Sequence, residues 1–158
     1  MSIQAKLPAI SRTVLGLAFA VFGANYFLHF LPMPAPAPEA GAFLGALVAG
    51  KIFAVIKPLE IAAGLALLGN RFVPLALAVL APIEIAIVVF HGVFDPAGLI
   101  LPLVLVALTA HLAWAYRDAF APMLRATVEP TFPAPPTTVT LRFMIQSFTT
   151  ATSAHIRD

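Results

Sequence analysis

Two acidic residues and one lysine lie inside long apolar stretches of this sequence. Lys57 and Glu60 fall within the apolar stretch 52–69, and Glu84 falls within the apolar stretch 72–92. A charged side chain at the centre of a bilayer costs about 2.5–3.5 kcal/mol on insertion scales, so such residues are usually paired, functional or both. Lys57 and Glu60 are three positions apart, which places them on one face of a helix. The pattern suits proton exchange, or binding of the polar part of an apolar ligand.

A fourth polar residue, Asn25, is expected at a similar depth. Asn25, Lys57 and Glu84 each lie 13 residues from the polar residue that marks one common end of their stretches. At 1.5 Å per residue this distance is about 20 Å, near the middle of a bilayer. We therefore expect Asn25, Lys57, Glu60 and Glu84 to meet in the interior as one polar cluster. Two interpretations stay open: a site for protons or for a polar head group such as that of a quinone, and a structural lock on helix packing.

Histidines near the ends of the apolar stretches are the other candidates for chemistry. His29 and His91 fall at the ends opposite to those just counted, and the chain contains no cysteine. Without a visible third ligand, two histidines favour hydrogen bonding at the membrane interface over a metal site. No Ser/His/Asp arrangement, phosphate-binding loop or haem-attachment signal is present, so no catalytic residue, metal or intrinsic cofactor is assigned.

The composition indicates which solvent the chain requires. Of the 158 residues, 61% are hydrophobic and 10% are charged, whereas a soluble domain carries about a quarter charged residues. Such a chain cannot cover a surface that faces water, so the lipid bilayer is its expected partner. The net charge of +2 is small and the basic residues are scattered, which argues against nucleic-acid binding.

Four stretches are long and apolar enough to be membrane-spanning helices. They are residues 10–31, 52–69, 72–92 and 99–116. The sequence therefore predicts an all-α fold, a bundle of four transmembrane helices. Residues 39–70 would form a helix of about 45 Å, too long for the hydrocarbon core. We divide them at Gly50-Lys51, which leaves a short interfacial or re-entrant helix before the second span.

The remaining sequence and the charges complete the predicted organisation. Residues 1–126 form the transmembrane domain, and residues 127–158, rich in Pro and Thr, form a cytoplasmic tail. One side of the predicted membrane carries Lys6, Arg12, Arg71, Arg117 and Arg125, and the other carries Glu39, Lys51 and Asp95. Because cytoplasmic loops are enriched in Lys and Arg, both termini are expected in the cytoplasm.

Several segments resemble the DoxX-like family of small four-helix membrane proteins. They are residues 23–32, Ile56-Lys57-Pro58-Leu59-Glu60, residues 64–77, Leu80-Ala81-Pro82-Ile83, Phe90-His91 and residues 113–118. The resemblance implies a four-helix bundle in a bacterial cytoplasmic membrane, with Asn25, Lys57, Glu60 and His91 at polar positions of the family. The family takes its name from a subunit of a thiosulfate:quinone oxidoreductase. Where relatives tend to carry Asn, this chain has Ala86.

Three functions are compatible with these features. The first is a non-catalytic integral subunit that packs against other membrane protein subunits of a larger respiratory or photosynthetic electron-transfer complex. The second is a DoxX-like, quinone-linked oxidoreductase subunit in which Lys57, Glu60 and Glu84 handle protons at the head group. The third is a small transporter, although the four spans show no clear inverted repeat.

Overall fold

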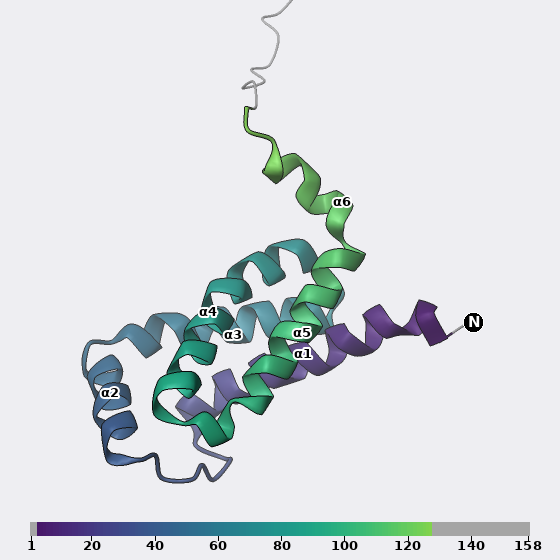
Figure 1. Ribbon diagram of the computed structural model, residues 1–158. Coiled ribbons are helices and arrows are strands. Elements are labelled where there is room, and N and C mark those ends of the chain that lie inside the picture. Colours follow the sequence, from purple (N-terminus) through teal and green to yellow (C-terminus); the bar gives the residue numbers. More distant parts are fainter. Residues whose placement is uncertain (1–2, 128–158) are drawn as a thin grey trace, which may run out of the picture. The chain divides into compact units, whose positions relative to one another are not determined.

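The protein is all α-helical over the part that the computed structural model describes, residues 3–127 (Figure 1). The chain separates into two units, residues 1–124 and residues 125–158. The predicted tail, apart from its first residue, lies outside the described residues. The all-α class expected from the sequence is confirmed for residues 3–127.

Six α-helices follow one another along the first unit. They are α1 (Ile3–Leu28), α2 (Pro38–Ala49), α3 (Ile52–Leu68), α4 (Val73–Phe94), α5 (Ile100–Ala115) and the short α6 (Arg117–Phe120). Short 3-10 turns at Pro96–Gly98 and Ala121–Leu124 precede α5 and follow α6. The second, third and fourth predicted spans agree with α3, α4 and α5 to within two residues at each end.

Three of the helical segments in the described residues are long and apolar enough to cross a membrane. They are Lys6–Leu28, Val73–Phe94 and Pro96–Ala115. The helices α2 and α3 qualify only as a pair, and they are bent by 87° at the break between them. With 17 residues, α3 is about 25 Å long, close to the shortest length that spans a hydrocarbon core. The chain thus has three or four candidate spans.

The bend between α2 and α3 falls at the predicted position. Gly50 ends α2, and Lys51 adopts a left-handed backbone with φ of 61°. A left-handed residue cannot continue an α-helix, so the two apolar segments separate here. The helix α2 then packs against α4, where the ring of Phe43 stacks on the rings of Phe90 and Phe94 at centroid distances of 6.0 and 5.2 Å.

The first helix differs in its bounds from the span predicted at residues 10–31. The helix begins at Ile3 instead of residue 10 and ends at Leu28 instead of residue 31. At its end, the Asn25 side chain bonds the backbone of Leu31, accepting from its N–H at 2.7 Å and donating to its carbonyl oxygen at 3.2 Å. His29 turns left-handed with φ of 50°, so the helix stops three residues earlier than its hydrophobicity suggests.

The four long helices pack as a closed ring of neighbours. The helix α1 packs most extensively on α3, α3 packs on α4, α4 packs on α5, and α5 returns to α1. Each of the four helices supplies at least one fully buried leucine to the common core. These leucines are Leu15, Leu67, Leu77, Leu80 and Leu112.

Glycine makes the contact between α1 and α3 unusually close. A Cβ atom built on Gly64 would lie 2.6 Å from the backbone nitrogen of Ala20 and 2.8 Å from the carbonyl oxygen of Gly16. Both neighbours are backbone atoms, which cannot rotate out of the way. Small residues at such contacts let helices gain dispersion energy at short range, the main source of helix association in lipid.

We expect Gly64→Ala to destabilise the protein by about 1–3 kcal/mol, because an added methyl group must push α1 away from α3. The matched control is Gly45→Ala, since a Cβ at Gly45 meets nothing within 4 Å. Alanine's higher helix propensity should leave that control as stable as the unmodified protein, or up to about 1 kcal/mol more stable. Unfolding in mixed micelles with increasing dodecyl sulfate, followed by circular dichroism, measures both. Equal stability of the two variants would contradict the close contact.

Candidate functional site

The first charged site lies within a single helix. The ammonium nitrogen of Lys57 donates to both carboxylate oxygens of Glu60, each at 2.9 Å. Both side chains lie near the middle of α3, where the three-residue spacing places them on one face. The Lys57 nitrogen also lies 5.4 Å from the ring centroid of Phe53, and Tyr26 meets that ring edge-on at a centroid distance of 5.7 Å.

The side chains of Lys57 and Glu60 differ in their exposure to solvent. The Glu60 side chain is 3% exposed and the Lys57 side chain 18% exposed. Gly23 of α1 covers the base of Glu60, since a Cβ on Gly23 would lie 3.3 Å from the Glu60 Cβ. Removing a charged group from water costs several kcal/mol, and the attraction between the two charges of an ion pair offsets this cost only when they are in direct contact. Two contacts at 2.9 Å meet this condition, so Glu60 has its counter-charge within the protein.

The second charged site joins two helices. The hydroxyl of Thr109 on α5 donates to Oε1 of Glu84 on α4 at 2.6 Å. Both residues are buried, with 3% of Glu84 and 8% of Thr109 exposed. Glu84 is near the middle of the 22-residue α4 and continues its buried stripe one turn after Leu80. This distance is at the short end of the range for hydrogen bonds between two oxygen atoms.

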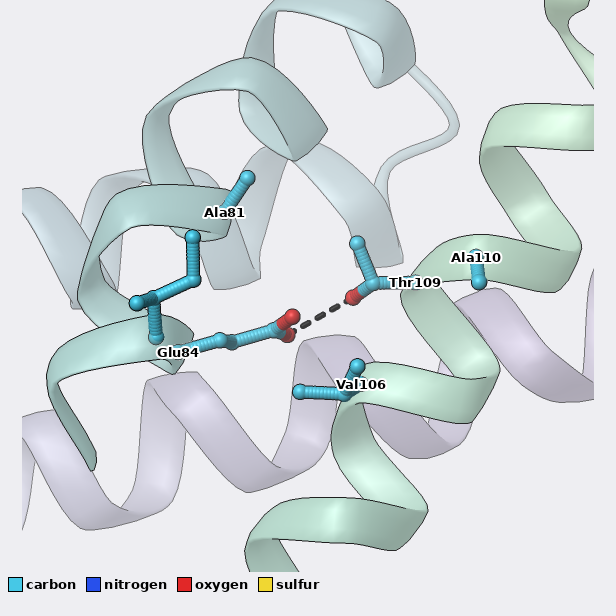
Figure 2. Close-up of a pocket in the computed structure, with 6 residues that line it drawn as sticks. Ala81, Glu84, Val106, Thr109 and Ala110 are labelled. Carbon is cyan, nitrogen blue, oxygen red and sulfur yellow. Dashed lines mark hydrogen bonds between the residues drawn. The ribbon is translucent and has the colours of Figure 1, made fainter. Parts of the chain in front are cut away.

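A cavity of about 190 Å³ opens over this hydrogen bond. Figure 2 shows the Glu84 carboxyl group and the Thr109 hydroxyl approaching each other across the space between α4 and α5. The cavity is lined by Ala81, Glu84, Ile85, Val106, Thr109 and Ala110. Ile85 is 63% exposed and Ala110 is also exposed, so the cavity is reached from the outer surface of the helices. Its walls are apolar apart from the two hydrogen-bonded side chains.

Glu84 has no counter-charge in the part of the chain that the structure describes. No described Lys, Arg or His lies within 4.0 Å of its carboxyl oxygens, whereas Lys57 is held by Glu60. Its second oxygen, Oε2, makes no hydrogen bond to any described residue. A carboxyl group accepts hydrogen bonds when ionised and donates one when protonated. Glu84 therefore keeps one free position for an additional partner beside the cavity.

Asn25 has a local structural role at the end of α1. It is 8% exposed, and both polar atoms of its side chain are used by the backbone of Leu31. The four residues expected to form one cluster are thus distributed over three hydrogen-bonded arrangements. Lys57 and Glu60 are together as the spacing suggested, while Glu84 bonds Thr109 and Asn25 bonds Leu31.

The two histidines lie near helix ends, as their positions in the sequence indicated. His29 directly follows α1 and is exposed. His91 lies in the last turn of α4, with Nδ1 2.9 Å from the Ile87 carbonyl oxygen and Nε2 3.9 Å from Asp95 Oδ2. Within residues 3–127 no group of three or more His, Cys, Asp or Glu side chains could hold a metal ion.

Thr109 is the site residue that the sequence analysis missed. It is the only hydroxyl-bearing residue in the stretch 99–113, and this isolation was the available signal. A lone threonine in an apolar helix commonly bonds a backbone carbonyl one turn earlier, so the sequence does not reveal that its partner is Glu84.

The structure thus defines the class of the protein: an all-α chain with three or four helices apolar enough to span a membrane, and with carboxylates buried at mid-helix. Comparison with models of protein families, with curated proteins and with solved structures finds no match to this chain. The resemblance to the DoxX-like family therefore stays a prediction from the residues alone.

The Lys57–Glu60 contact predicts non-additive stability. Lys57→Met leaves Glu60 without a counter-charge, which costs about 3–5 kcal/mol in a buried site. Glu60→Met should cost less, because the partly exposed Lys57 can extend toward water. We expect the double variant to be more stable than Lys57→Met alone, measured by dodecyl sulfate unfolding.

A matched control is the exposed pair Arg117–Asp118, whose charged atoms are 4.0 Å apart and whose side chains are 60% and 96% exposed. Its double-mutant cycle should show a coupling of about 0–1 kcal/mol. If the losses for Lys57→Met and Glu60→Met simply add, the Lys57–Glu60 contact contributes nothing to stability.

Proposed function

We propose that the protein is a four-span integral membrane protein that binds a lipid-soluble molecule through the cavity between α4 and α5. The observation that carries the proposal is the Glu84 carboxyl group, which is bonded to Thr109 at 2.6 Å beside a cavity of about 190 Å³. Polar residues at membrane depth are costly and are functional candidates by default. Glu60 has Lys57 as its counter-charge, whereas no Lys, Arg or His among the described residues lies within 4.0 Å of Glu84.

The proposed spans are α1, α3, α4 and α5, with α2 lying at one membrane face. The ring of contacts among these four helices supports a bundle, and the 87° bend turns α2 away from the direction of α3. The basic residues Arg12 and Arg71 are at one end of this bundle and Asp95 is at the other. By the positive-inside rule both termini lie in the cytoplasm of a bacterium, with the protein in its cytoplasmic membrane.

The size and chemistry of the cavity favour a small ring with hydrogen-bonding oxygens. A dry cavity of about 150 Å³ accommodates benzene, so about 190 Å³ holds one six-membered ring while a longer tail stays in lipid. Glu84 and Thr109 offer a proton donor or acceptor to a carbonyl or hydroxyl on that ring. A quinone head group has this chemistry, and the family that the chain resembles takes its name from a subunit of a thiosulfate:quinone oxidoreductase. In this proposal the protein's own residues bind and orient the head group and exchange a proton with it at Glu84.

We expect Ala110→Leu to abolish labelling by a photoreactive azido-quinone, because the larger side chain fills the cavity. Thr109→Val should weaken labelling about five- to tenfold, the effect of losing a hydrogen bond worth about 1–1.5 kcal/mol. Mass spectrometry of peptides from α4 and α5 in labelled protoliposomes measures both.

The control for this experiment is Ala107→Leu, which enlarges an exposed alanine on the same helix that does not line the cavity. Its labelling should equal that of the unmodified protein. Undiminished labelling of Ala110→Leu, or labelling confined to other helices, would refute quinone binding at this site.

A second candidate function, a non-catalytic subunit of a larger electron-transfer complex, is favoured by one face of α2. Gly41, Gly45 and Ala49 follow one another at four-residue spacing, and a Cβ on Gly45 meets nothing within 4 Å. Phe43, on the other side of the helix, already packs against α4. Small residues spaced in this way let a second helix approach closely, so this face is available to a neighbouring membrane subunit.

If that face is a subunit contact, Gly45→Leu should abolish co-purification of partner subunits in mild detergent, because the larger side chain prevents close approach. The matched control is Gly92→Leu on α4, since Gly92 also has nothing within 4 Å of a built Cβ. Quantitative mass spectrometry of the purified membrane fraction provides the comparison. Unchanged partners in Gly45→Leu, or no partners with the unmodified protein, would exclude a role for this face.

A further inference from the structure

Two arginines are brought together at the end of the bundle where α3 turns into α4 and α5 ends. The Tyr116 hydroxyl donates to Asn70 Oδ1 at 3.5 Å, and Arg117 and Arg71 directly follow these two residues. Tyr116 also packs against the hydrophobic core, which fixes the end of α5 relative to the turn. Arg71 and Arg117 therefore lie at the same end of the bundle, and both residues are exposed.

A third arginine reaches this end from α1. Gly16 contacts the last turn of α3, since a Cβ built on it would lie 2.9 Å from both the Gly64 carbonyl oxygen and Leu68 Cγ. Arg12 is one helical turn before Gly16 on the same face, level with the turn after α3. Its Nε is shielded from solvent and makes no hydrogen bond to any described residue.

An exposed tryptophan marks the level of this basic end. Trp114 is 72% exposed, and the guanidinium carbon of Arg117 lies 5.5 Å from its ring centroid. Exposed tryptophan at the end of an apolar helix is typical of the level of lipid head groups. The carboxylate nearest to Arg117, that of Asp118, is 96% exposed and 4.0 Å away, so water largely screens it. The end of the bundle therefore keeps an excess of positive charge.

We propose that Arg12, Arg71, Arg117 and Trp114 bind the phosphate-bearing head group of an anionic phospholipid. Guanidinium groups fit phosphate oxygens in a bidentate fashion, and the three arginines belong to the end of the bundle where Trp114 is exposed. The acyl chains of the same lipid would lie along the exposed apolar side chains of α5, such as Val104 and Leu103. This site is separate from the Glu84–Thr109 hydrogen bond, since Thr109 lies five residues, about one and a half turns, before Trp114 on α5.

The only tryptophan of the chain is Trp114, so its fluorescence reports the lipid at this position. We expect brominated phosphatidylglycerol to quench it at several-fold lower mole fraction than brominated phosphatidylcholine, in vesicles of unlabelled phosphatidylcholine. Each basic residue near an anionic head group contributes a factor of about five in affinity. Arg71→Gln and Arg117→Gln should therefore each lower the preference for phosphatidylglycerol about fivefold, while Arg71→Lys retains most of it.

The control is Lys51→Gln, which removes one positive charge at the break before α3, at the opposite end of that helix. Its lipid preference should equal that of the unmodified protein, and circular dichroism should show the same helix content in every variant. Equal quenching by the two brominated lipids would overturn the proposal. So would a preference that falls as much in Lys51→Gln as in the two arginine variants, since general attraction to the membrane would then explain it.

Discussion

Pairing of polar groups without help from water is the constraint on which this structure depends. A chain with 61% hydrophobic residues and three or four helices apolar enough to cross a membrane is suited to lipid, where an unpaired polar group costs several kcal/mol. Helices satisfy the backbone internally, and the few interior polar side chains must find partners of their own. Lys57 and Glu60 form an ion pair within α3. The Asn25 side chain makes hydrogen bonds to the backbone N–H and carbonyl oxygen of Leu31, just after α1.

Glycines between α1 and α3 both allow close helix packing and help to bury Glu60. Gly16 and Gly64 let the backbones of α1 and α3 meet, and Gly23, about two turns after Gly16 on α1, lies directly over Glu60 and Ile61. A larger residue at Gly23 would meet Ile61 at 2.8 Å and lift α1 from the charged side chain. The close packing of these helices therefore also shields Glu60 from its surroundings, while Lys57 stays partly exposed.

The surroundings of Glu84 differ from those of Glu60. Alanines at positions 81 and 110 leave the groove between α4 and α5 open, and the hydroxyl of Thr109 compensates only one of its carboxyl oxygens. Two almost fully buried carboxylates thus differ in their partners: Glu60 has a counter-charge, and Glu84 has only a hydroxyl. The Lys57–Glu60 pair is expected to contribute to stability, whereas Glu84 lies beside a cavity and carries the proposed function.

The sequence by itself determined the helical class, the apolar segments, the break at Gly50-Lys51 and the proximity of Lys57 to Glu60. These features are local, because segment hydrophobicity and a three-residue spacing act within one helix whatever surrounds it. Tertiary structure alone decided that Glu84 bonds Thr109, 25 positions away. This partner depends on how α4 and α5 are rotated about their axes, and that rotation is fixed by packing between helices. The leucine core sets it here, and no short stretch of sequence contains that information.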